Sequence, residues 1–128
     1  CFRESVSDAV RRIAETDEDI VVWWASRVEC ISAMARRQRE DVLSAEAAHR
    51  ARAILSALSE QWSEVQPSEV VRDRADRLLS GLPLRAADGL QLAAALVWAE
   101  ESPKGLEFVC LDQNLREAAL REGFTVLP

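Results

Sequence analysis

The chain has 128 residues, with 16 basic and 22 acidic side chains, one histidine and a net charge of −6. This length predicts a single domain, residues 1–128, with room for a hydrophobic core. Four glycines and four prolines are too few for a disordered chain or a turn-rich all-β protein. A single histidine argues against a multi-histidine zinc site, and the acidity argues against coating a nucleic-acid backbone with basic side chains. The negative net charge is still compatible with an enzyme that binds phosphate through metal ions.

Three features favour a cytoplasmic protein that does not enter a membrane. No apolar run approaches the ~20 residues that span a bilayer. The first residues, CFRESVSDAV, lack the apolar stretch of a signal peptide. The cysteines, Cys1, Cys30 and Cys110, are odd in number and form no CxxC pair, which is typical of a reducing compartment.

The N-terminal half predicts a helix, a strand and two further helices. Apolar residues recur at positions 6, 9, 10 and 13 with helical spacing. The apolar and β-branched run 20–24 suits a strand buried on both faces. Ser26 and Glu29 match a capping box at the start of a helix, and Ser44 caps a second helix that runs to about Trp62.

The C-terminal half adds strands and three helices. Residues 64–66 predict a short strand, and Ser68 caps a helix that Gly81 closes. The helix 85–101 is apolar nearly all round, so we expect it to be deeply buried. Strands are expected at 108–111 and 124–127, on either side of a short helix that ends at Gly123. By their apolar context, three tryptophans are expected in the core: Trp23, Trp62 and Trp98.

This alternation of strands and amphipathic helices favours an α/β fold with a mostly parallel sheet. Three strands are clear and a fourth is possible, whereas five or more helices need more sheet than that to cover their apolar faces. The inventory is therefore short of one strand, and the first predicted element is a helix.

Three acids occupy positions where they could carry chemistry. Glu29 lies in the first helical turn after the strand that ends at Trp24, and Asp112 directly follows the strand that ends at Leu111. Asp88 is the only acid between positions 82 and 99, on a helix whose other residues are predicted to lie mainly in the core. Ligands of open parallel sheets bind beyond the carboxyl ends of the strands. Converging carboxylates repel one another, and Mg²⁺ or Mn²⁺, which prefer oxygen ligands, would relieve that repulsion.

Each acid also has a purely structural interpretation. Glu29 completes the capping box with Ser26, Asp88 interacts with the positive end of its helix, and Asp112 caps the helix that follows it. These roles and metal binding are not exclusive, since Asp112 could cap and coordinate at once.

Four segments, in order, resemble the motifs of PIN-domain ribonucleases. Residues 85–96, RAADGLQLAAAL, resemble the family's third acidic motif, and residues 108–119, FVCLDQNLREAA, resemble its strand–Asp–helix motif. The SRVE segment at 26–29 resembles its Ser-x-x-Glu motif, and EGFTVLP at 122–128 is a typical ending. Within the family, the chain most resembles VapC-type toxins of bacterial toxin–antitoxin pairs.

The resemblance implies a PIN-like three-layer α/β/α sandwich and cleavage of RNA phosphodiester bonds by water activated on Mg²⁺ or Mn²⁺. It implies that Glu29, Asp88 and Asp112 coordinate the metal. It also implies a homodimer inhibited by a cognate VapB-type antitoxin. The family's opening strand, which ends in a metal-binding Asp, has no counterpart in these residues, and Asp8 lies inside a helical pattern instead. The resemblance therefore implies that residues upstream of Cys1 carry both the missing strand and its acid.

Two other classes of protein compete with the nuclease. A catalytically inactive PIN-like module would act by binding a partner or by dimerising, which the missing acid favours. A phospho-receiver domain also clusters acids on a parallel sheet, but it needs a lysine at the end of a late strand. The only lysine, Lys104, precedes its strand.

Overall fold

The computed structural model describes residues 20–128. This part of the chain forms five α-helices and four strands of three residues each. In order they are β1 (Val21–Trp23), α2 (Ser26–Arg39), α3 (Ala45–Ser59), β2 (Ser63–Val65), α4 (Glu69–Gly81), α5 (Ala86–Trp98), β3 (Glu107–Val109), α6 (Gln113–Glu122) and β4 (Thr125–Leu127). The helix expected around positions 6–13, with Asp8, lies outside the described residues, as does Cys1.

The strands form two separate parallel pairs. Strand β1 pairs with β2, with Val22 opposite Glu64, and β3 pairs with β4, with Phe108 opposite Val126. Within residues 20–128 no hydrogen bond joins one pair to the other. The expected PIN-like three-layer sandwich with a mostly parallel sheet is therefore wrong for this structure, which is mainly helical. The physical reason is that β1 and β3 are separated by a cleft, so the two pairs never become one sheet.

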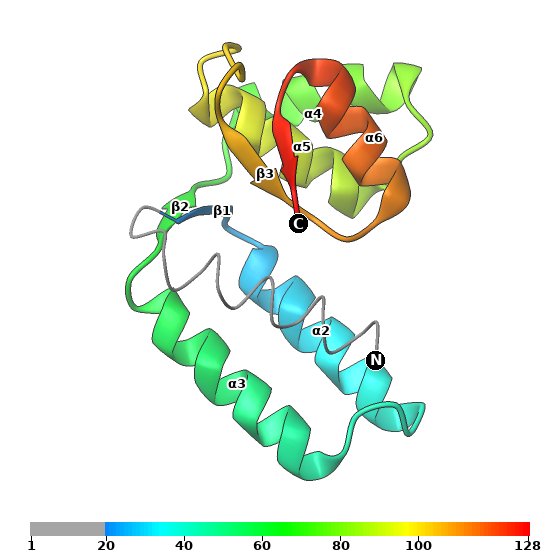
Figure 1. Cartoon of the computed structure of the whole chain (residues 1–128). Coiled ribbons are helices and arrows are strands. Elements are labelled where there is room, and N and C mark those ends of the chain that lie inside the picture. Colours follow the sequence, from blue (N-terminus) through cyan, green and yellow to red (C-terminus); the bar gives the residue numbers. More distant parts are fainter. Residues whose placement is uncertain (1–19) are drawn as a thin grey trace.

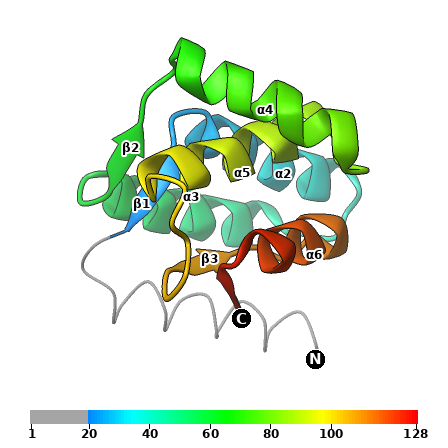
Figure 2. The ribbon, with the colours of Figure 1, turned by 90° about the horizontal axis from the view of Figure 1, so that it is seen from above.

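The core is built around α5. This helix contacts α4, α6, β1 and β2, and Figure 2 shows it between α4 and α6. Leu92 and Ala93 have no exposed surface and Leu96 is 1% exposed. Burial of apolar side chains is the main favourable term in folding, so the packing of α5 orders the surrounding elements. Deep burial of this helix was expected and is confirmed for its central turns.

The helices α2 and α3 lie side by side (Figure 1). Arg27 of α2 donates a hydrogen bond from Nη1 to Oγ of Ser59, at the far end of α3, over 3.1 Å. Only Ala48 and Leu55 of α3 are buried, so this helix pair has a smaller share of the core than α5. None of the helices among residues 20–128 combines the length and apolarity that crossing a bilayer requires.

Three of the four predicted N-caps are confirmed. The side chains of Ser44, Ser68 and Asp112 each accept a hydrogen bond from the backbone N–H three residues later. The capping box of Ser26 and Glu29 is wrong, because α2 begins at Ser26, its N-cap is Ala25, and no side chain caps it. Glu29 bonds elsewhere, as described below.

The tryptophans differ in their burial. Trp23 is 7% exposed and belongs to the core, as expected, and Trp62 is half-buried. Trp98 was also expected in the core, but 51% of its surface is exposed. It is the last residue of α5, beyond the turns that α4 and α6 cover, and its ring lies in the cleft between the strand pairs.

We expect Gly123→Ala to destabilise the fold and Gly81→Ala to leave it intact. Gly123 ends α6 with φ at +110°, and an added Cβ would lie 3.2 Å from Cγ of Pro103. Left-handed backbone costs a residue with a Cβ about 1–2 kcal/mol, and urea unfolding should show a loss of that size. Gly81 has an open surrounding and an ordinary φ, so its alanine variant should unfold at the same or higher urea concentration. Equal losses in both variants would contradict this account.

Candidate functional site

The three candidate acids lie at the starts of three helices. Glu29 is in the first turn of α2, directly after β1. Asp88 is in the first turn of α5. Asp112 is the N-cap of α6, after β3. Because helix N-termini carry partial positive charge, each position favours a carboxylate.

Glu29 is held by a residue from a distant part of the chain. Gln91 of α5 donates a hydrogen bond from Nε2 to Oε2 of Glu29 over 3.1 Å. This contact joins positions 62 residues apart and brings the start of α2 to the start of α5. It leaves Oε1 of Glu29 for another partner.

Gln91 is the residue of this site that the motifs left without an assigned role. It follows Asp88 by three positions, and residues three apart share a face of a helix. That spacing places Gln91 beside the proposed acid, but only the tertiary contact with α2 shows which group it bonds.

Electrostatic repulsion links the three acids. Burial raises the pKa of Glu29 above its ordinary value of 4.5, and the charge of Asp88 raises it further. Burial also raises the pKa of Asp88 above 3.8, the charge of Asp112 adds to the rise, and Arg85 opposes it. Asp88 therefore interacts with both other acids and is the centre of the group.

No salt bridge among residues 20–128 neutralises these acids. The ion pairs in this part of the chain join Arg72 to Glu69, and Arg74 to Glu101 and Glu122. Arg85 acts on Asp88 through charge without forming such a pair. Half-buried carboxylates that no cation in this part of the chain pairs with favour binding of a cation from solution.

Asp112 caps helix α6 with one of its two carboxylate oxygens. Its Oδ2 accepts the backbone N–H of Leu115 over 3.0 Å, so the predicted N-cap is confirmed. The side chain is exposed, which leaves Oδ1 accessible to solvent or a ligand. Capping fixes the direction of the carboxylate, and this is compatible with coordination by the second oxygen.

The neighbouring Cys110 does not add a soft ligand near neutral pH. Burial raises the pKa of its thiol to about 11; Arg116 lowers it, and Asp112 and Asp88 raise it. The thiolate is the form that acts as nucleophile or metal ligand, so this thiol remains protonated at pH 7. The chemistry of the site is therefore that of carboxylate oxygens.

The donor set fits Mg²⁺ or Mn²⁺ in part. Within residues 20–128 no three His, Cys, Asp or Glu side chains gather closely enough to form a ready metal-binding group. Mg²⁺ retains several waters, however, and is often bound by one or two carboxylates together with phosphate of the substrate. Two carboxylates are enough for such a site. The pair Glu29 and Asp88, or the pair Asp88 and Asp112, has the charge and the oxygen donors that it needs.

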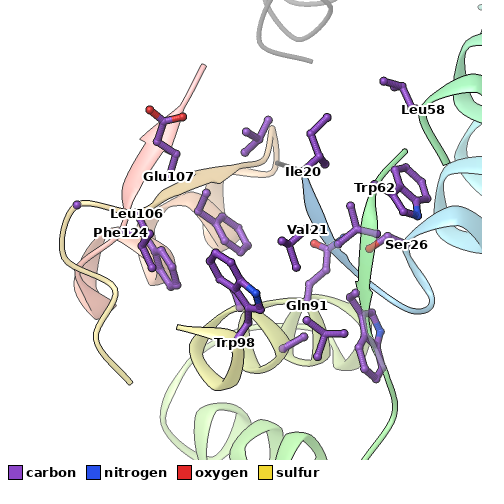
Figure 3. A pocket seen from close by; sticks show the side chains of 18 residues that line it. Ile20, Val21, Ser26, Leu58, Trp62, Gln91, Trp98, Leu106, Glu107 and Phe124 are labelled. Atoms are coloured by element: carbon purple, nitrogen blue, oxygen red, sulfur yellow. The ribbon is translucent and has the colours of Figure 1, made fainter. Parts of the chain in front are cut away.

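An apolar cleft of about 600 Å³ lies beside this group, between the two strand pairs. Gln91 lines it and also bonds Glu29, while none of the three acids lines it. Figure 3 shows Val21, Gln91 and Trp98 around the cleft. The cleft and the acids are thus neighbouring but distinct features.

Comparison with known proteins leaves the family open. No protein-family model matches the chain, and no curated protein matches it significantly.

Replacing Asp88 with asparagine should lower the pKa of Glu29. The change removes a neighbouring negative charge while keeping the size of the side chain, so the carboxylate of Glu29 becomes easier to ionise. Titration of the side-chain carboxyl carbons by NMR measures this directly. In Asp73→Asn, an exposed acid of α4, Glu29 should titrate as in the unchanged protein. A Glu29 pKa that is the same in both variants would refute the proposed repulsion.

Replacing Glu29 with glutamine should increase stability more at pH 7 than at pH 4. A raised pKa means that the folded state holds the proton of Glu29 more tightly than the unfolded state. The unfolding free energy therefore falls as pH rises from 4.5 through the raised pKa, and Glu29→Gln escapes this loss. Urea unfolding at both pH values measures the difference.

Glu46→Gln is the matched control, because Glu46 also lies in the first turn of its helix, α3, and is exposed. It should show no gain at pH 7. A pH dependence of the Glu29 variant equal to that of the control would contradict the prediction.

Proposed function

We propose that this protein is a metal-dependent endoribonuclease, the toxin of a VapBC-type toxin–antitoxin pair, with Glu29, Asp88 and Asp112 as its acidic site. The proposal comes from the four motif-like segments and from the charges of the acids. It does not rely on a sandwich fold. The observation that carries it is the raised pKa of two half-buried carboxylates, Glu29 and Asp88. Burial is the larger cause and repulsion by a neighbouring acid adds to it, and no cation among residues 20–128 forms a salt bridge with either.

The described residues have separate roles in this proposal. Gln91 orients Glu29 through its 3.1 Å hydrogen bond, and the cap to Leu115 orients Asp112. Asp88 interacts by charge with both, so in this proposal the group binds a cation more strongly than separate carboxylates would. When bound, Mg²⁺ or Mn²⁺ would supply activation of water and stabilisation of charge on phosphate.

The same proposal covers the partners. An acidic protein of net charge −6 repels RNA, and divalent cations held by the acids would offset that repulsion locally. By its resemblance to VapC-type toxins, we propose a cytoplasmic homodimer that a VapB-type antitoxin inhibits.

Cleavage of a mixture of RNA by the full-length protein with Mg²⁺ or Mn²⁺ tests the activity. Asp88→Asn should reduce the rate by roughly 100-fold or more, since bound metal contributes several kcal/mol to the transition state. Asp73→Asn, with an exposed acid of α4, should retain full activity. Equal rates for the two variants would refute the role of Asp88, and cleavage in excess chelator would refute the need for metal.

A non-catalytic module that binds a partner or dimerises is the second candidate. The lack of a ready three-ligand metal group among residues 20–128 favours it. Thermal unfolding distinguishes the two, because a metal that binds only the folded state raises the melting temperature by mass action. Millimolar Mn²⁺ should raise it for the nuclease and leave it unchanged for the module.

A further inference from the structure

The side chain of Gln91 engages one particular oxygen of Glu29. Its Nε2 lies 3.1 Å from Oε2 of Glu29, and the bond is partly buried. An ionised carboxylate only accepts hydrogen bonds, so the atom of Gln91 that faces it is the amide nitrogen, which donates. The two oxygens of Glu29 are therefore unequal, because Oε2 accepts from the protein and this bond does not use Oε1.

The donor is carried by the helix at the centre of the core. Gln91 belongs to α5 and is followed by Leu92 and Ala93, neither of which has exposed surface. Gln91 itself is half-buried and lines the wall of the cleft. Closely packed side chains move little, so the amide is held in place before any ligand binds.

Glu29 comes from a different helix, and the bond to Gln91 restricts its direction. Glu29 lies in the first turn of α2, where no side chain forms a cap that would hold it. A glutamate side chain has several rotatable bonds, and a bond to a neighbouring helix removes part of that freedom. Asp88 lies one turn before Gln91, so α5 supplies one acid of the group and orients another.

We propose that Gln91 is a positioning residue that makes Glu29 bind a cation through Oε1 alone. The inference rests on the proposed metal-dependent function. It adds how one of the acids binds the cation and which residue decides this.

The size of the cation determines the consequence of binding through one oxygen. An amide N–H on Oε2 competes with a cation for that oxygen, because both place positive charge against its lone pairs. Mg²⁺ is small, demands near-octahedral geometry and is bound by few carboxylates, whereas Ca²⁺ takes more oxygens and accepts carboxylates through one oxygen or both. Gln91 therefore favours Mg²⁺ over Ca²⁺, and removing its amide would open the two-oxygen mode that suits Ca²⁺.

Cation binding to the full-length protein tests the proposal without any measurement of cleavage. The effect of bound Mn²⁺ on water proton relaxation gives its dissociation constant, and competition with Mn²⁺ gives those of Mg²⁺ and Ca²⁺. Gln91→Leu removes the donor and keeps a similar size, and leucine suits the apolar cleft that this position lines. It should weaken Mg²⁺ binding by roughly 10-fold or more, as loss of a residue that holds a metal ligand commonly does. Binding of Ca²⁺ should weaken less.

Gln38→Leu is the matched control for this experiment. Gln38 is an exposed glutamine near the other end of α2, the helix that carries Glu29. Its leucine variant should bind both cations as the unchanged protein does.

NMR of the Gln91 side-chain amide tests the same geometry in the unchanged protein. The two Nε2–H signals are identified as the pair that Gln91→Leu removes. When the protein is saturated with Mg²⁺, the bond to Oε2 should persist, so these protons should exchange with solvent no faster than in the metal-free protein. Clearly faster exchange with Mg²⁺ bound would mean that the cation has displaced the amide, and it would overturn the proposal.

The remaining outcomes separate the role of Gln91 from the proposed function. An unchanged protein that binds neither Mg²⁺ nor Mn²⁺ would refute the metal site and the role of Gln91 together. An equal preference for Mg²⁺ over Ca²⁺ in the unchanged protein and in Gln91→Leu would refute the role of Gln91 and leave the metal site standing. The same result follows if the variant loses affinity for both cations by the same factor, since that loss would reflect general structure.

Discussion

The packing of α5 is the constraint on which the rest of the described structure depends. Its central turns are fully enclosed, with Leu92 and Ala93 at 0% exposure, and it contacts two helices and two strands. Both the acids and the cleft are arranged around this one element. Its first turn carries Asp88, and its last turns, with Ala94 and Trp98, line the cleft.

Gln91 connects these two features. It lines the cleft and donates to Glu29, so one side chain touches both the apolar surface and the acidic group. The strength of the acidic group comes from its surroundings, because burial is the largest cause of the raised pKa of both Glu29 and Asp88. The same residues on an exposed surface would be ordinary solvated carboxylates.

The positions of the strands were easier to predict from the sequence than their arrangement. The positions of the strands were predicted well, since all four short strands lie within two residues of their expected positions. The pairing of those strands was predicted wrongly, because pairing depends on contacts between distant segments. Among residues 20–128, two parallel pairs formed where one sheet was expected, with an apolar cleft between β1 and β3.

The sequence by itself determined what depends on near neighbours. Ser44, Ser68 and Asp112 cap their helices through bonds to the third residue along, so local pattern was sufficient to predict them. The tertiary structure alone decided the role of Glu29, because Gln91, 62 positions away, takes the carboxylate that a capping box would have used. It also decided that Trp98 is exposed and that Asp88 interacts by charge with Glu29 and with Asp112, since burial and charge coupling depend on which elements meet in space.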